Sequence, residues 1–181
     1  MFPEYDRVTS VLAPFSGMDK IPKHILDAAS DRGTRVHALC NGIIEGIEVE
    51  VPEEFKGYLD SFKQWAEGKV LLPSSGRMFN DELMVTGECD GTYTKNGITT
   101  IFDLKTSQKE SKSWPLQGAC YSRLYGHLDL QTFIILDKHG GAPKEFHYAY
   151  EENIETFMKC LDLYRLFFKN KKTEQQGYDY L

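Results

Sequence analysis

The stretch TGECDGTYTKNGITTIFDLKTS, residues 86–107, decides the fold of this chain. It has the pattern of two short strands joined by Asn96-Gly97, a dipeptide that favours the tight turn of a β-hairpin. If these two residues form the loop, counting back along both strands places Asp90 opposite Asp103. Facing carboxylates repel each other at a cost of about 0.2–1 kcal/mol. A divalent cation between them would reverse the sign, because Mg²⁺ and Mn²⁺ prefer hard oxygen ligands.

Lys105 completes a candidate polar cluster. It lies two residues beyond Asp103, so the alternation of side chains along a strand returns it to the same face. The alternative is an ordinary surface hairpin, in which Lys105 only neutralises nearby carboxylates, including Glu88, which the same register places opposite it. The hairpin geometry alone does not decide between these interpretations.

Composition indicates a folded chain that fits one domain over residues 1–181, with residues 170–181 as a tail that could be flexible. The 181 residues are 41% hydrophobic, which allows a sizeable core. No apolar run approaches the ~20 residues of a membrane span, and the N-terminus lacks a signal-peptide pattern, so we expect a cytoplasmic protein without a membrane partner. The cysteines have no CxxC spacing, which argues against zinc or iron–sulfur binding and favours buried free thiols. They are Cys40, Cys89, Cys120 and Cys160.

The charge balance bears on nucleic-acid binding in two ways. A net charge of −6 is unfavourable, because basic surface supplies most of the affinity for phosphate. Lysine and arginine are nevertheless concentrated in residues 20–35 and 105–112, away from most of the acidic excess. The chain could thus carry a locally basic groove on an acidic body, or an ordinary acidic surface.

Apolar periodicity predicts an α/β fold with a mixed central β-sheet flanked by helices. Helices are expected at residues 8–15, 22–46, 52–68, 114–125 and 151–169. Strands besides the hairpin are expected at residues 70–72, 77–85, 130–136 and 145–150. Residues 32–34 could divide the second helix in two. The last helix should place four apolar side chains inward: Ile154, Phe157, Leu161 and Phe168.

Four further residues could join the site, and each also has an ordinary explanation. His37 lies within a predicted helix, where a histidine is more often packed than a metal ligand. Gln117 and Tyr121 are four residues apart and share a helix face, but could simply belong to the core. Glu82, on the strand predicted before the hairpin, is most often a solvated acid.

Taken together, these residues occur in motifs whose order is informative. RGTRVH (32–37) is followed by Glu82, GECD (87–90), FDLKTS (102–107) and QGACY (117–121). This series resembles the PD-(D/E)XK nuclease superfamily, specifically its RecB-like branch with phage-type exonucleases, which is known for G-T-x-x-H, G-x-x-D, D-x-K-T and Q-x-x-x-Y. The resemblance spans about residues 8–125 and implies a restriction-endonuclease-like core.

The resemblance implies a divalent metal ion, Mg²⁺ or Mn²⁺, as cofactor. Asp90 and Asp103 would be ligands, helped by the backbone carbonyl of Leu104, and His37 would supply a nitrogen ligand. Metal ions neutralise a phosphodiester, lower the pKa of bound water and stabilise the leaving oxygen.

The catalytic residues implied by the matching positions share the hairpin and its neighbours. Lys105 would orient or polarise the attacking water, and Gln117 and Tyr121 would position the site or the DNA backbone. Glu82 would be the acid that often precedes G-x-x-D. The full implied set is Glu82, Asp90, Asp103, Lys105, Gln117 and Tyr121.

Three departures from the family pattern qualify this expectation. Cys89 precedes Asp90 where the family name has proline, which is usual for this branch. Glu88 adds an acid that could weaken the approach of phosphate or recruit a second ion. The clustered cysteines of the iron–sulfur relatives and a helicase segment are missing.

The sequence therefore favours a metal-dependent DNA nuclease, an exodeoxyribonuclease of phage or mobile-element recombination or replication in a bacterial or phage-infected host cell. DNA is the expected partner, and a homo-oligomer and a recombination or replication partner protein remain open. One alternative is a catalytically silent nuclease-fold accessory factor that binds DNA or protein. Another is a metal-dependent hydrolase of a small phosphorylated substrate.

Overall fold

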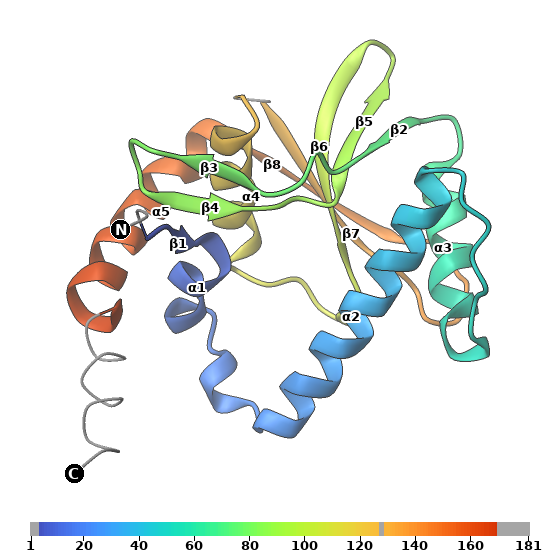
Figure 1. Ribbon diagram of the computed structural model, residues 1–181, viewed down its shortest axis with the longest axis horizontal. Helices are drawn as coiled ribbons and strands as arrows, with labels where there is room; N and C mark the ends of the chain where they lie inside the picture. The colour runs from blue at the N-terminus through green and yellow to red at the C-terminus, as the bar shows by residue number, and fades with distance from the viewer. Residues whose placement is uncertain (1–3, 127–128, 170–181) are drawn as a thin grey trace.

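A computed structural model describes residues 4–126 and 129–169 of the chain (Figure 1). Its centre is a five-stranded sheet with strand order β2-β5-β6-β7-β8. β6 and β7 are parallel and the other pairs are antiparallel, so the sheet is mixed. The strands are β2 (Val70–Pro73), β5 (Gly91–Lys95), β6 (Ile98–Lys105), β7 (Leu130–Ile135) and β8 (Lys144–Ala149). The predicted mixed sheet flanked by helices is confirmed.

The β5–β6 hairpin has the predicted register. Lys95 pairs with Ile98 across the turn. Asn96 and Gly97 both have positive φ, at 52° and 79°, as a type I′ turn requires. The ladder continues one step past β5, because the Asp90 N–H donates to the Phe102 carbonyl at 3.2 Å.

A second sheet corrects one prediction. Residues 77–85 do not form one strand; they form β3 (Met78–Asn80), a turn, and the start of β4 (Val85–Gly87). The Asn80 side chain accepts a hydrogen bond from the Leu83 N–H at 2.8 Å and stabilises the reversal. β4 lies between β3 and β1 (Asp6–Arg7), to which it is parallel.

Helices cover both faces of the five-stranded sheet (Figure 1). They are α1 (Val8–Leu12), α2 (Lys23–Ile44), α3 (Lys56–Ala66), α4 (Trp114–Leu124) and α5 (Tyr150–Tyr164). α2 and α3 pack on one face through a core that includes Phe102 and Leu104 of β6. α1, α4 and α5 share a second core with β4 and Cys89. Within the described residues, no helix is long and apolar enough to cross a bilayer.

Two helix predictions are settled by the structure. α2 is one continuous helix, so residues 32–34 do not divide it. The last helix ends at Tyr164 and continues as a π-helical turn, η4 (Arg165–Lys169). Phe157 and Leu161 are buried as predicted, but Phe168 is 40% exposed, because the change of helical pitch turns it away from the core. The predicted tail at 170–181 lies outside the described residues.

Candidate functional site

The first part of the site is a contact between α2 and the start of the hairpin. His37 on α2 places Nδ1 2.9 Å from Oδ1 of Asp90. The other oxygen of Asp90 accepts a hydrogen bond from the Leu104 backbone N–H at 2.6 Å. The Asp90 carboxylate thus links α2, the start of the hairpin and β6, and its side chain is only 14% exposed.

The second part is a chain of polar side chains between β6 and α4. The Lys105 ammonium contacts Oδ2 of Asp103 and donates to Oε1 of Gln117 at 3.3 Å. Gln117 Nε2 in turn donates to the Tyr121 hydroxyl oxygen at 2.9 Å. The ammonium also lies 5.7 Å from the centre of the Trp114 ring, within cation–π range. Lys105 is therefore held in place before any substrate arrives.

Electrostatics differ sharply between the two aspartates. Burial opposes ionisation of Asp90, but the charge and hydrogen bond of His37 and the Leu104 N–H outweigh it and hold the pKa of Asp90 below its ordinary value. Burial by itself would lower the pKa of His37, yet the neighbouring Asp90 raises it. The pair thus favours a carboxylate beside an imidazolium.

The pKa of Asp103, in contrast, is shifted toward the neutral acid. Burial raises its pKa, the Lys105 ammonium opposes the rise, and the charge of Asp90 adds to it, so the net shift is upward. Its Oδ2 atom is buried and receives no well-directed hydrogen bond from any described residue, although the Lys105 charge is adjacent. Ionised, this oxygen has an unused lone pair that a cation could accept.

These donors fit a divalent metal ion in chemistry, but they are not assembled as a finished cluster. Among residues 4–126 and 129–169, no three His, Cys, Asp or Glu side chains lie together in a metal-binding arrangement. Both aspartates instead pair with protein cations, His37 and Lys105. A divalent ion would replace these partners at two closely placed carboxylates, one of which keeps a buried oxygen without a hydrogen bond.

Two acidic residues lie apart from this cluster. Glu82 is not on a strand: it lies in the turn between β3 and β4, and its largely exposed carboxylate pairs with Arg123 of α4 at 2.8 Å. Its position gives no support to a catalytic role. Glu88 contacts Arg77 at 3.8 Å and not Lys105, whose partner is Asp103.

A cavity of about 550 Å³ opens beside the first part of the site. Its lining includes His37 and Asp90 together with Arg7 and Arg77. The two arginines were missed by the sequence reasoning, because no motif surrounds them and only the three-stranded sheet brings them to the hairpin. They place two guanidinium groups beside the His37–Asp90 pair, and one of them, Arg77, lies 3.8 Å from Glu88.

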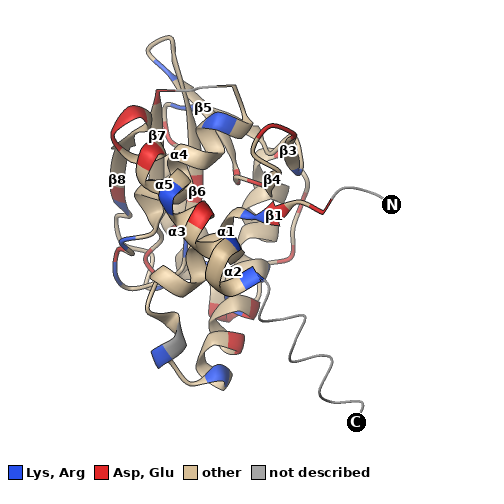
Figure 2. Ribbon diagram, turned by 90° about the vertical axis from the view of Figure 1, so that its left-hand side faces the viewer, with Lys and Arg blue, Asp and Glu red and all other residues tan. Residues whose placement is uncertain are grey.

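A second cavity, of about 680 Å³, adjoins the other part of the site. Lys105 and Gln117 line it, along with Lys109, Lys112 and the ring of Trp114. Figure 2 shows basic and acidic segments intermixed over the helices and strands in this view. Each of the two cavities thus has basic side chains in its lining, together with acidic ones: Glu88 and Asp90 in the first and Glu110 in the second.

Similarity to known proteins is confined to solved structures, since no protein-family model and no curated protein sequence matches the chain. The crystal structure of SSO0001 is similar with a TM-score of 0.51 at 11% identity, over 93% of this chain and 78% of that one. LHK-Exo, an alkaline exonuclease from Laribacter hongkongensis, is similar with a TM-score of 0.44 at 11% identity, over 96% of this chain and 95% of that one. The likeness to SSO0001 concerns the fold alone, and the likeness to LHK-Exo is too distant to carry an argument.

Proposed function

We propose that this protein is a metal-dependent DNA nuclease that hydrolyses phosphodiester bonds with Mg²⁺ or Mn²⁺. The observation that supports it most is the meeting of Asp90, Asp103 and Lys105 at one end of the β5–β6 hairpin, where the Lys105 ammonium contacts the Asp103 carboxylate. A restriction-endonuclease-like core and membership of the RecB-like branch are part of the proposal and rest on the sequence motifs.

The proposed metal site uses oxygen ligands from the hairpin. Asp90, Asp103 and the Leu104 carbonyl would hold the ion, with His37 as nitrogen ligand. When bound, the ion supplies charge neutralisation for the phosphodiester and a lower pKa for water. The hairpin fixes both carboxylates in advance, so little rearrangement of the backbone is needed.

The remaining residues act on the water and the phosphate. Lys105 would orient the attacking water and stabilise negative charge on the phosphate oxygens, for which its compact ammonium is suited. Gln117 holds Lys105 by a hydrogen bond and is itself held by Tyr121. Both are therefore proposed as positioning residues for the lysine.

Exonuclease action in phage or mobile-element recombination or replication is the finer form of the proposal and rests on the family resemblance. One observation favours a second candidate, a nuclease-fold accessory factor that binds without cutting. Asp90 and Asp103 already have cationic partners in the protein, His37 and Lys105.

Digestion of labelled DNA separates these functions. The protein is incubated with linear and with circular duplexes in Mn²⁺ or in EDTA. Loss of linear DNA only, in Mn²⁺ only, indicates an exonuclease, and nicking of circles indicates an endonuclease. Retention of DNA without cleavage in either condition indicates the accessory factor. Hydrolysis of small phosphate esters alone indicates a metal-dependent hydrolase of a small phosphorylated substrate.

Lys105→Ala is expected to reduce the cleavage rate by at least about 10²-fold, because it removes a preorganised charge at the reacting phosphate. Mn²⁺ binding and the melting temperature should remain close to those of the unchanged protein. Lys159→Ala, at an exposed lysine on α5, is the matched control and should cut at the normal rate. A fully active Lys105→Ala protein would refute the assigned role.

A further inference from the structure

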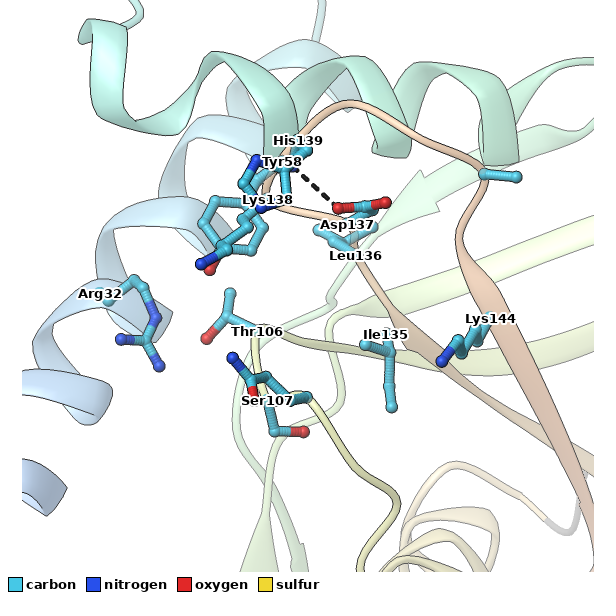
Figure 3. Close-up of a pocket in the computed structure, with 12 residues that line it drawn as sticks. Arg32, Tyr58, Thr106, Ser107, Ile135, Leu136, Asp137, Lys138, His139 and Lys144 are labelled. Carbon is cyan, nitrogen blue, oxygen red and sulfur yellow. Dashed lines mark hydrogen bonds between the residues drawn. The ribbon is translucent and has the colours of Figure 1, made fainter.

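A third cavity lies on the side of β6 that faces α2 and α3. It has a volume of about 620 Å³ and is bounded by α2, the ends of β6 and β7, and the connection from β7 to β8. Figure 3 shows Arg32 of α2, Lys138 of the β7–β8 connection and Lys144 of β8 around this cavity, together with Thr106 and Ser107. None of these residues belongs to the proposed catalytic set.

The three cations have no ion-pair partner within the described part of the chain. No ion pair between described residues includes Arg32, Lys138 or Lys144. Arg35, three residues further along the same helix, shows the contrast, because it lies 3.2 Å from Glu54 and 3.9 Å from Asp31. Neighbouring cations that form no ion pair repel one another and attract an anion.

Arg32 carries the strongest sign of a missing ligand. Its Nε atom is buried and has no hydrogen-bond acceptor among the described residues. A buried donor without an acceptor is costly, and a guanidinium presents its donors in the planar fork that suits phosphate oxygens. The carboxylate in the lining, Asp137, does not fill this need, since its Oδ1 accepts from the His139 backbone N–H at 2.8 Å.

The cavity is joined to the candidate site through the chain itself. Thr106 and Ser107 line it and follow Lys105 directly. Ser107 also lines the cavity that contains Lys105 and Gln117, so the two cavities adjoin at this residue. A polymer with regularly spaced phosphates can occupy both places at once, whereas a free phosphate can occupy only one.

We propose that this cavity binds a backbone phosphate of DNA next to the phosphate that is cut, through Arg32, Lys138 and Lys144. The inference rests on the proposed function for the identity of the ligand. It adds a positioning site at the carboxyl end of β6, next to the cavity that contains Lys105. It also accounts for how a chain of net charge −6 can hold a polyanion.

The test measures DNA binding without cleavage. Labelled duplex and single-stranded DNA are titrated with full-length protein in EDTA, by fluorescence anisotropy, at several salt concentrations. The double variant Lys138→Ala/Lys144→Ala should bind roughly tenfold more weakly, and its slope of log affinity against log salt should fall by about 0.9 for each phosphate that the protein no longer neutralises. The matched control Lys63→Ala/Lys159→Ala removes two exposed lysines of α3 and α5 and should keep the original slope.

Arg32→Ala provides a second measurement and is checked for folding by circular dichroism. Lys138 and Lys144 are both exposed, so we expect the double variant to fold. It therefore tests phosphate binding by the cavity even if Arg32→Ala fails to fold. Equal affinity and slope for the double variant and its control would overturn the inference.

A titration with inorganic phosphate, followed by the amide NMR signals of Thr106 and Lys138, identifies the source of the anion. Phosphate-dependent shifts in a protein that binds no DNA would overturn the DNA assignment in favour of a free anion. DNA binding that depends on the cavity, without cleavage in Mn²⁺, would leave the inference standing and remove the proposed nuclease function. The two failures are therefore distinguishable.

Discussion

Asp103 occupies a position where the needs of the fold conflict with those of the proposed metal site. Its pKa is raised, so its ionised form lowers the free energy of unfolding. Because the shift is upward, this penalty is absent below the ordinary pKa of 3.8 and develops as the pH rises above it. A carboxylate that costs stability at neutral pH is typical of a functional residue.

Asp103→Asn should separate the two roles. The amide removes the penalty of the buried charge, so the melting temperature in EDTA at neutral pH should stay the same or rise. Mn²⁺ affinity, measured by calorimetry, should fall because a neutral amide is a poorer ligand than a carboxylate. Unchanged Mn²⁺ affinity would count against Asp103 as a ligand, and a large loss of melting temperature would indicate a structural role.

Residue spacing was enough to predict much of the site. The Asn96-Gly97 turn fixes the register and hence the Asp90–Asp103 proximity, and helical spacing brings Gln117 to Tyr121. The contact of His37 with Asp90 came only from the family motif, since no local rule relates α2 to the hairpin. Strand alternation also placed Lys105 on the face of Asp103, as observed, whereas the sequence did not show that Glu88 would contact Arg77 and not Lys105.

Elements were predicted well where their signals are local. The hairpin, α2 and α4 have strong turn or helix signals. The failure at residues 77–85 has a specific cause: the Asn80 side chain reverses the chain in the middle of apolar residues that otherwise look like one strand. The sequence also did not predict the cavity with Arg32, Lys138 and Lys144. This cavity forms only because β6 and β7 pair in parallel and α2 lies across their ends.

One close approach between elements positions Lys138. Gly57 of α3 is so near the β7–β8 connection that a Cβ atom there would lie 2.0 Å from the Lys138 carbonyl oxygen. The Gln64 side chain of the same helix donates to the Gly140 carbonyl at 2.7 Å. α3 thus fastens the loop that carries one wall of the cavity.

Gly57→Ala should therefore destabilise the protein. Gly→Ala inside an unobstructed helix stabilises by about 0.5–1 kcal/mol, but here the methyl group meets backbone and should cost about 1–3 kcal/mol. We expect the melting temperature to fall by about 2–4 °C per kcal/mol. Lys63→Ala, exposed on the same helix, should leave it nearly unchanged. A gain in stability for Gly57→Ala would show that the connection is not held against α3.

At the scale of the molecule, one buried carboxylate ties the beginning of the described chain to its end. The Asp6 side chain of β1 is 4% exposed and lies 2.8 Å from Nε of Arg165 and 2.7 Å from Nζ of Lys169. Arg165 also donates to the Leu83 carbonyl at 2.6 Å, in the turn before β4. The three-stranded sheet is thereby anchored to the helix that covers the main sheet.

Replacing Arg165 by methionine should loosen this anchor. The change leaves the Asp6 carboxylate with one cation and the Leu83 carbonyl without its donor, at a cost of about 1–3 kcal/mol for each group left unsatisfied. Thermal unfolding should begin at a lower temperature, and Lys159→Met on exposed α5 surface is the control. Equal melting of the two variants would mean that the anchor contributes nothing.

The buried thiol of Cys89 can be used to measure local unfolding at the Asp90 end of the hairpin. Adjacent to Asp90 in the chain, it is 1% exposed, and its thiol donates to the Gly91 carbonyl at 3.6 Å. Burial raises the pKa of Cys89 to about 12, so at neutral pH almost none of it is the reactive thiolate. An alkylating reagent can modify this sulfur only while the surrounding backbone is open. The rate of alkylation therefore measures how often the segment around Asp90 unfolds locally. Binding of the proposed ion or of DNA to the folded segment would lower that rate.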